Sequence, residues 1–227
     1  MKIAIIGYGK MGHVIERIAR ERGHEIVCTI DMGEEAKFES AEFKTADVAI
    51  EFTQPDAAIN NYHMAWAAGV PVVSGTTGWT ARMEEIRREI AERKATLCWT
   101  SNFSLGVNIV MDINERLAAI MKRYDGYNVA MTEVHHTEKK DAPSGTAIVL
   151  ADGIEKNYGV RPEIESVREG KVPGIHEIRY DSVFDIITLR HEAKSRDGLA
   201  LGAVVAAEFM QGKPAGFYSM RDLMGNN

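Results

Sequence analysis

The sequence predicts an α/β fold in which an open parallel sheet is interrupted by an inserted α+β domain built on a mixed sheet. Two observations lead to this prediction. Between residues 2 and 99, short apolar runs alternate with stretches of helical periodicity, which is typical of a parallel sheet covered by helices. Later, the strand-like runs Glu163–Arg168, Ile175–Tyr180 and Asp185–Ala193 follow one another without a helix, which indicates a separate, largely antiparallel or mixed sheet.

The chain opens with a strand, a glycine-rich turn and a helix. Lys2–Ile6 is an apolar run typical of a buried parallel strand, and apolar residues at helical spacing follow the turn. The turn reads Gly7-Tyr8-Gly9-Lys10-Met11-Gly12. Gly7 makes the tight turn, Gly9 lets a pyrophosphate approach the backbone, and Gly12 allows the helix to pack closely on the strand. This motif predicts a Rossmann-like, dinucleotide-binding domain.

The residues after the second strand bear on the choice of dinucleotide. Glu25–Ile30 is the expected strand, and Asp31 stands where a carboxylate would hydrogen-bond the adenosine ribose hydroxyls. A carboxylate repels the 2′-phosphate of NADPH, and the following Met32 offers no cation to hold one. The sequence therefore predicts a preference for NADH, with NADPH as the alternative because Lys37 could still reach a 2′-phosphate.

Further strands, Asp47–Phe52, Val70–Ser74 and Thr96–Trp99, alternate with helices expected at 57–68 and 80–94. Ligands of an open parallel sheet bind at the carboxyl ends of its strands. The Gly75-Thr76-Thr77 turn would then offer backbone and hydroxyl groups to a nicotinamide carboxamide, or would simply cap a helix. The predicted cofactor contacts are Gly7, Tyr8, Gly9, Lys10, Met11, Gly12, Asp31, Phe52, Gly75, Thr76, Thr77, Ser101, Asn102 and Phe103.

The stretch from Glu133 to Ala147 gathers two histidines, two lysines and an aspartate. The expected strand Asn128–Val134 delivers His135 and His136 to a strand end. Neighbouring strand residues point to opposite faces, so we do not expect these two histidines to chelate one metal, and no metal site is predicted. One imidazole is expected to bind or protonate a substrate while the other supports it.

A helix is predicted directly after Pro143. Ser144 is a good N-cap, and the helix is expected from Gly145 to about Tyr158. The first amides of a helix have no intrahelical acceptor and lie at the positive end of its dipole, so they favour a carboxylate or phosphate. Gly145 and Thr146 are therefore predicted to bind substrate, close to Lys139. The residues available for burial are Ile148, Leu150, Ala151 and Ile154.

Composition narrows the class of protein. The 227 residues carry a net charge of −6, which argues against general affinity for nucleic acids or anionic membranes. Cys28 and Cys98 are far apart, which suits a reducing compartment, and we expect a cytoplasmic protein. No signal peptide or membrane-spanning run is expected. An anionic small molecule would thus need a local basic site such as the histidine stretch.

Taken in order, these motifs resemble the dihydrodipicolinate reductase family, also named for 4-hydroxy-tetrahydrodipicolinate, over nearly the whole chain. The histidine stretch is the family's most specific signature. The stretches that carry the resemblance are Gly7–Gly12, Glu51–Thr53, Gly75–Gly78, Asn102–Asn108, His135–Ala147, His191–Arg196 and Gly216–Asp222.

The resemblance implies an NAD(P)H-dependent oxidoreductase that reduces a small cyclic dicarboxylate to tetrahydrodipicolinate in the diaminopimelate route to lysine. It also implies a homotetramer of two-domain subunits. The domains would be 1–106 with 197–227 for the dinucleotide, and 107–196 for substrate binding and oligomerisation. The roles that the resemblance transfers are His135 as proton donor, Lys139 as substrate-binding and catalytic lysine, His136 as support, and Gly145 and Thr146 as carboxylate contacts.

Two other functions stay open from the residues alone. One is a different NAD(P)-dependent dehydrogenase of the amino-acid type, and the other is a non-catalytic dinucleotide-sensing protein. His176 and His191 lie in strand-like runs and are expected to be packed or surface histidines. Lys194 and Arg196 would add positive potential or form salt bridges between the domains.

Overall fold

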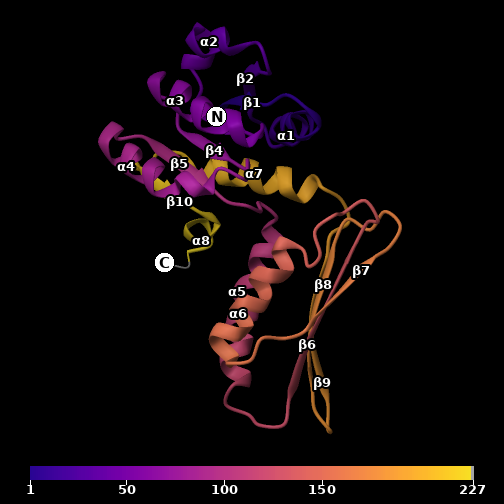
Figure 1. Cartoon of the computed structure of the whole chain (residues 1–227). Helices are drawn as coiled ribbons and strands as arrows, with labels where there is room; N and C mark the ends of the chain where they lie inside the picture. The colour runs from indigo at the N-terminus through magenta and orange to yellow at the C-terminus, as the bar shows by residue number, and fades with distance from the viewer. Residues whose placement is uncertain (226–227) are drawn as a thin grey trace. The chain divides into compact units, whose positions relative to one another are not determined.

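The computed structural model describes residues 1–225. The chain divides into two compact units: Met1–Ser104 together with the chain from Leu199 onward, and Leu105–Gly198. The chain thus leaves the first unit, builds the second and returns to complete the first (Figure 1). The second unit begins two residues before and ends two residues after the predicted domain 107–196.

The first unit contains a six-stranded sheet in the order β10-β5-β4-β3-β1-β2, and all of its pairings are parallel. The parallel sheet predicted for this part of the chain is confirmed. Its strands are β1 (Lys2–Ile6), β2 (Glu25–Ile30), β3 (Val48–Glu51), β4 (Val72–Ser74), β5 (Thr96–Trp99) and β10 (Gly216–Tyr218). Strand β10 was not predicted, because three residues beginning with glycine carry no usable periodicity.

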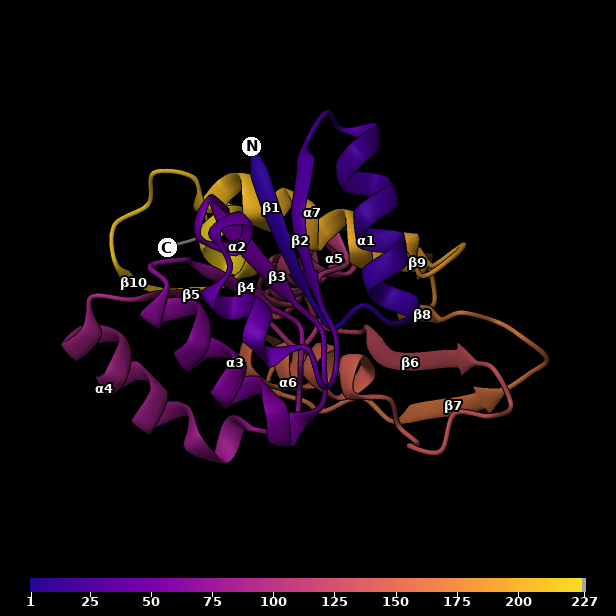
Figure 2. The same ribbon diagram turned by 90° about the horizontal axis from the view of Figure 1, so that it is seen from above.

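Helices cover both faces of this sheet, with α1 and α7 on one face and α3 and α4 on the other (Figure 2). Because both faces are covered, every residue of β1 after Lys2 is buried. The helices of the unit are α1 (Lys10–Glu21), η1 (Glu35–Glu39), α2 (Ala41–Lys44), α3 (Pro55–Ala67), η2 (Thr80–Arg82), α4 (Met83–Arg93), α7 (Asp197–Met210) and α8 (Met220–Leu223). The single helix predicted at 80–94 is therefore η2 followed by α4.

The second unit is built on a four-stranded mixed sheet in the order β7-β6-β8-β9. The strands are β6 (Asn128–His135), β7 (Ile164–Arg168), β8 (Ile175–Asp181) and β9 (Ile186–Glu192). β6 pairs with β7 in parallel, whereas β6 with β8 and β8 with β9 are antiparallel. The predicted mixed sheet is confirmed.

Two helices, α5 (Leu105–Met121) and α6 (Gly145–Tyr158), pack together in the second unit and share a core with the sheet. The α6 residues in that core are Ala147, Leu150, Ala151 and Ile154. Their spacing places one stripe of the helix toward the core. Ile148 lies one position off that stripe and is 40% exposed, so its predicted burial is wrong.

The register of the mixed sheet aligns its polar residues. Glu133 on β6 lies opposite His176 on β8, and His176 lies opposite His191 on β9. On the other side of β6, His135 lies opposite Arg168 on β7. At the end of β6, ionisable side chains from all four strands therefore lie side by side across the sheet.

No helix within residues 1–225 combines the length and the apolarity that a membrane crossing requires.

Candidate active site

The β1–α1 turn has the geometry that a bound dinucleotide requires. Gly7 adopts φ +91°, and a Cβ there would lie 2.0 Å from the carbonyl oxygen of Phe52. A Cβ at Gly12 would lie 2.4 Å from the carbonyl oxygen of Gly7, so the helix packs directly on the turn. At Gly9 a Cβ would meet nothing within 4 Å. The backbone of this residue therefore faces open space, as a pyrophosphate contact needs.

A cavity of about 290 Å³ lies at the carboxyl ends of β1, β2 and β3. Four predicted cofactor residues, Gly7, Gly9, Asp31 and Phe52, line it. The other lining residues are Ile6, Ile30, Met32, Glu35, Phe38, Thr53, Gln54, Ala57 and Asn61. An apolar cavity with an acid at the end of β2 suits an adenosine whose ribose hydroxyls bond to Asp31.

The segment after Asp31 is acidic. The backbone amide of Asp31 donates to Glu34 (3.0 Å), and that of Gly33 donates to Glu35 (3.1 Å). The Lys37 ammonium is held by the Glu34 carboxylate (2.7 Å) and by the Thr29 carbonyl (3.0 Å). The hydrogen bond from Lys37 lowers the pKa of Glu34. The cation that could have received a 2′-phosphate thus already has two partners.

Thr76 lies within a hydrogen-bond network of its own loop. Its side chain is 5% exposed, and its hydroxyl donates to the Glu51 carboxylate (3.0 Å) and accepts from the Thr53 amide (2.8 Å). Two indoles, those of Trp79 and Trp99, donate to its carbonyl at 2.9 and 2.8 Å. The Thr76 hydroxyl is thus engaged within its own loop. A contact between this loop and a nicotinamide carboxamide stays a prediction.

Glu51, at the end of β3, is the centre of that network; it belongs to the Glu51–Thr53 motif, but no role was predicted for it from the sequence. It is fully buried, and its carboxylate accepts from Ser74 (2.5 Å), from Thr76 and from the Thr53 hydroxyl. Burial raises the pKa of Glu51, against the hydrogen bonds from Ser74, Thr53, Thr76 and Asn61, which lower it. The network joins the ends of β3 and β4.

The remaining predicted cofactor residues surround this edge without lining the cavity. The Phe52 ring would meet a Cβ at Gly75 at 2.3 Å and lies 5.9 Å from the buried Phe103 ring. Tyr8 hydrogen-bonds Glu16, which raises the pKa of the tyrosine. The others are Lys10 and Met11 in the first turn of α1, Thr77 after β4, and Ser101 and Asn102 after β5.

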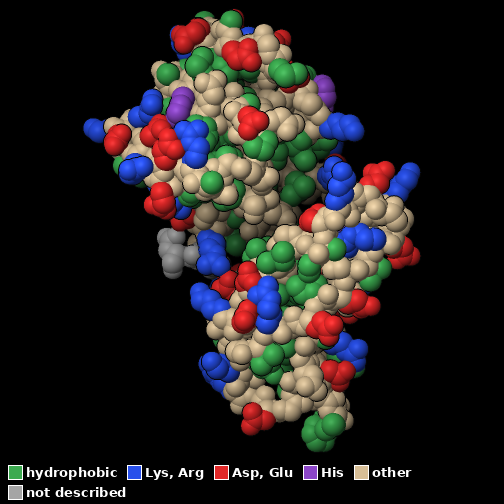
Figure 3. Space-filling view, viewed as in Figure 1, with side chains coloured by type: hydrophobic (Ala, Val, Ile, Leu, Met, Phe, Trp, Pro, Cys, Tyr) green, Lys and Arg blue, Asp and Glu red, His purple; other side chains and the backbone are tan. Residues whose placement is uncertain are grey.

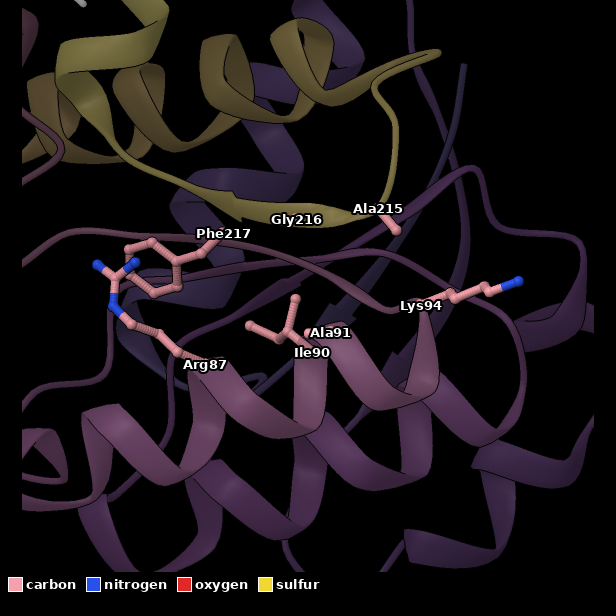
Figure 4. Close-up of a pocket in the computed structure, with 7 residues that line it drawn as sticks. All are labelled: Arg87, Ile90, Ala91, Lys94, Ala215, Gly216 and Phe217. Carbon is pink, nitrogen blue, oxygen red and sulfur yellow. The ribbon is translucent and has the colours of Figure 1, made fainter.

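A second cavity of about 360 Å³ lies between α4 and β10 (Figure 4). The Arg87 guanidinium stacks 3.9 Å from the centre of the Phe217 ring, and Lys94, which directly follows the end of α4, also lines the cavity. The cavity is at the amino end of β10, where Gly216 pairs with Thr96. Ligands of parallel sheets bind at the opposite edge, so this cavity is not the dinucleotide site.

In the second unit, the end of β6 presents His135 to a buried carboxylate. The Nδ1 atom of His135 pairs with Oε2 of Glu133, two residues earlier on the same face of the strand. Oε1 of Glu133 accepts from Arg168 Nη2 (2.8 Å) and from the Ser144 amide (3.3 Å). The same Arg168 nitrogen also donates to the carbonyl of Asp141 (2.6 Å).

The charges of this group follow from its contacts. Burial alone would raise the pKa of Glu133, but the hydrogen bond from Arg168 and the charge of His135 lower it. Burial lowers the pKa of His135, and Lys139 and Arg168 lower it further, while Glu133 opposes the shift. The site therefore holds an ionised glutamate beside an imidazole that gives up its proton readily.

His176 completes the buried polar group. It is 4% exposed, its ring stands at 73° to that of His135 with centroids 5.2 Å apart, and its Nε2 lies 3.2 Å from the Ser144 hydroxyl. Burial, and then the charge of His135, lower the pKa of His176 to about 4. This histidine is thus neutral near neutral pH. It is also packed, one of the two places, packed or surface, that were expected for it from the sequence.

The segment between β6 and α6 contains Lys139 and the N-cap of α6, Ser144. Lys139 forms an ion pair with Asp141 (2.9 Å), and that hydrogen bond lowers the pKa of the aspartate. Ser144 caps α6 by accepting from the Ala147 amide (3.2 Å), as predicted. A Cβ at Gly145 would meet nothing within 4 Å, so there is open space beside the first residue of the helix.

His136 does not share the surroundings of His135. It lines a cavity of about 470 Å³ together with Lys171 and Arg196, in the company of Thr137, Glu138, Gly170 and Pro173. The predicted divergence of the two histidines therefore holds. Of the predicted substrate residues, the structure brings Lys139 within electrostatic reach of His135 and gives His136 to a separate, cationic cavity.

One group among residues 1–225 has the donor atoms of a metal site. The ligand atoms of Glu133, His135 and His176 all lie within 4.8 Å of one another. However, one carboxylate oxygen bonds His135 and the other bonds Arg168, and Lys139 adds a second nearby cation. A divalent ion would have to displace these bonds against two positive charges, so the group fits a hydrogen-bond network better than a metal.

Comparison with known proteins identifies the family to which the chain is similar. Residues 1–103 match the family model described as dihydrodipicolinate reductase, N-terminus, and residues 106–224 match that for the C-terminus. A protein from Christiangramia forsetii named 4-hydroxy-tetrahydrodipicolinate reductase is 41% identical, covering 100% of this chain and 98% of its own length. One of that name from Thermosipho africanus is 33% identical, over 99% and 98%.

A solved structure agrees with the fold. Dipicolinate-bound dihydrodipicolinate reductase from Paenisporosarcina sp. TG-14 superposes with a TM-score of 0.81, at 21% identity, covering 96% of this chain and 97% of the other. The resemblance stated from the motifs is thereby confirmed. With both family models matched in order along nearly its whole length, the chain belongs to the dihydrodipicolinate reductase family.

Proposed function

We propose that this chain reduces 4-hydroxy-tetrahydrodipicolinate to tetrahydrodipicolinate with a hydride from NAD(P)H, the reaction after which its relatives are named. The product would serve diaminopimelate and lysine synthesis. The observation that carries the proposal is the buried Glu133–His135 pair with Lys139 and the start of α6, where there is open space beside Gly145. These groups match the chemistry of a dicarboxylate that accepts a hydride and a proton.

In this mechanism the bound nicotinamide supplies the hydride, and the residues of the chain position the substrate and move the proton. Lys139 and the amides at Gly145 and Thr146 bind the substrate carboxylates, since an ammonium and a helix start both favour anions. His135, hydrogen-bonded through Nδ1, donates a proton from Nε2 to the substrate atom that gains negative charge. Around His136, the separate cavity that it shares with Lys171 and Arg196 adds positive potential that favours a dianionic substrate.

NADH is the proposed preferred cofactor, with NADPH as the weaker one. The acidic segment around Asp31, Glu34 and Glu35 repels a 2′-phosphate, and Lys37 is already paired with Glu34. Comparing kcat/KM for the two cofactors tests this, and higher efficiency with NADPH would contradict it. Met32→Arg places a cation on an exposed side chain beside the acid, and should raise the efficiency with NADPH about tenfold.

We also infer a cytoplasmic homotetramer. Support comes from apolar side chains exposed over α5 and α6 and at the tip of the β8–β9 hairpin (Figure 3). Val183 and Phe184, in that tip, are 90% and 92% exposed. Exposed apolar patches of this kind mark interfaces between proteins. Light scattering on the purified chain measures the assembly, and a monomer at micromolar concentration would contradict the inference.

The reaction is tested by supplying the substrate in situ with dihydrodipicolinate synthase and following the loss of NADH. We expect oxidation that depends on the synthase product. His135→Gln should lower turnover about a hundredfold, as loss of an acid catalyst does. His63→Gln is a matched control, because His63 pairs with Glu89 outside the proposed site. Absence of oxidation with this product, or equal activity in His135→Gln, would contradict the proposal.

A further inference from the structure

We infer that Glu133 is the positioning residue of the second unit: its buried carboxylate fixes the tautomer of His135 and holds the start of α6 at the same time. The inference rests on the proposed role of His135 as proton donor. Oε2 receives the Nδ1–H of His135, while Oε1 receives Arg168 and the Ser144 amide. One side chain thereby joins the acid to the first turn of the helix that binds the carboxylates.

The carboxylate of Glu133 is a buried ion. Glu133 is 0% exposed, and a buried ion is stable only when it is paired and hydrogen-bonded. Arg168 provides that partner from β7, the parallel neighbour of β6. Arg168 also donates to the Asp141 carbonyl, so the same pair tethers the segment that carries Lys139.

The contact with Glu133 determines which nitrogen of His135 exchanges a proton with the substrate. An ionised carboxylate has no proton to donate, so the Nδ1 atom that it faces must carry the hydrogen. The neutral imidazole is then bare at Nε2, the atom left to exchange a proton with substrate. Gly174 lies over that atom: a Cβ there would stand 3.0 Å from Nε2. The residue type at 174 thus leaves space around the working nitrogen.

Charged groups from several elements surround the imidazole of His135. The groups that face His135 are Glu133 on its own strand, Arg168 on β7, His176 on β8, and Lys139 in the segment before α6. His176 in turn faces His191 on β9. Glu133 is the one anion among the groups that shift the pKa of His135, and it keeps the protonated imidazole accessible against two cations. An acid must be protonated to act, so activity falls as pH rises through the pKa of His135.

The decisive measurement is the ¹⁵N NMR spectrum of the histidines in the full chain, with His135 assigned from His135→Gln. We expect neutral His135 to carry its proton on Nδ1 in the wild type. In Glu133→Gln we expect the proton to redistribute toward Nε2 and the pKa of His135 to fall. A wild-type His135 protonated on Nε2 would overturn the inference, whether or not the variant folds.

Kinetics provide the second readout. In Glu133→Gln we expect kcat to fall about tenfold to a hundredfold, as removal of a supporting partner does. We also expect the alkaline limb of the pH–rate profile to move to lower pH, which a merely structural defect would not cause. The matched control is Glu177→Gln, a partly exposed carboxylate on β8 that pairs with Arg190. A folded Glu133→Gln with an unchanged alkaline limb would contradict the inference.

The two proposals fail separately. If the wild type oxidises no NADH with the synthase product, the proposed function is wrong, while the tautomer of His135 still tests the role of Glu133. If the wild type is active but the tautomer and pH limb ignore Glu133, the positioning role alone is wrong.

Discussion

Each unit of the molecule contains a fully buried glutamate, and the two are held in opposite ways. Glu51 is surrounded by neutral donors, the hydroxyls of Ser74, Thr53 and Thr76, and burial raises its pKa. Glu133 faces Arg168 and His135, and its pKa is lowered. The first is therefore a neutral-donor network that stiffens a loop, and the second is a charge that acts on another ionisable group.

The largest expected difference is in stability. Glu133→Ala leaves Arg168 without its partner, and removal of one member of a buried pair costs about 3–5 kcal/mol. We expect about 3 kcal/mol, because Arg168 is itself 19% exposed and regains some water. Glu51→Ala leaves hydroxyl donors unsatisfied and should cost about 1–3 kcal/mol. Urea unfolding measures both, and a larger loss for Glu51→Ala would reverse the comparison.

The pH dependence of stability should have opposite signs for the two residues. A lowered folded-state pKa means that the contribution of Glu133 is present above the unfolded value of about 4.3 and disappears as pH falls through the folded value. A raised pKa means that Glu51 contributes most below about 4.3 and loses this as pH rises through its folded value.

Unfolding of wild type, Glu133→Gln and Glu51→Gln across this acidic range measures the effect. The cost of Glu133→Gln should shrink as the pH is lowered, whereas the cost of Glu51→Gln should grow. Parallel pH dependence of the two variants would mean that both carboxylates are held in the same way.

The smallest expected effect concerns the loop that Glu51 stiffens. Thr76→Val removes one donor to Glu51 and one acceptor for the Thr53 amide, and should lower the unfolding free energy by about 1 kcal/mol. Thr77→Val is the matched control, because Thr77 is exposed. Thermal unfolding distinguishes them, and equal midpoints would show that Thr76 is not part of the scaffold.

The same contrast separates what the sequence could predict from what it could not. The apolar runs of β1 and β5 were predicted with their observed bounds, and α6 was predicted with its cap, because periodicity and capping are local signals. The short strand β10 has no such signal. The exposed Ile148 shows that an apolar residue near the stripe of a helix is not always within it.

The candidate site divides along the same line. His135, Lys139 and Gly145 could be proposed from their residue types and spacing, but Arg168 joins the site from a strand 33 residues after His135. One local signal for Glu133 was available. It lies two residues after Met131, on the face of β6 that is buried, and a buried carboxylate needs a charged or hydrogen-bonding partner. The use of the Thr76 hydroxyl depends on Glu51, 25 residues earlier, and local pattern does not indicate it.

The edge strand of the parallel sheet, β10, comes from the part of the first unit that is synthesised last. Strand β5 pairs with β4 on one side, and its other side is covered by β10, more than a hundred residues later in the chain. During synthesis on the ribosome, the β5 edge of the first unit therefore stays unpaired until the whole second unit has been synthesised. Truncation just before residue 216 should therefore expose the β5 edge and cause the protein to self-associate.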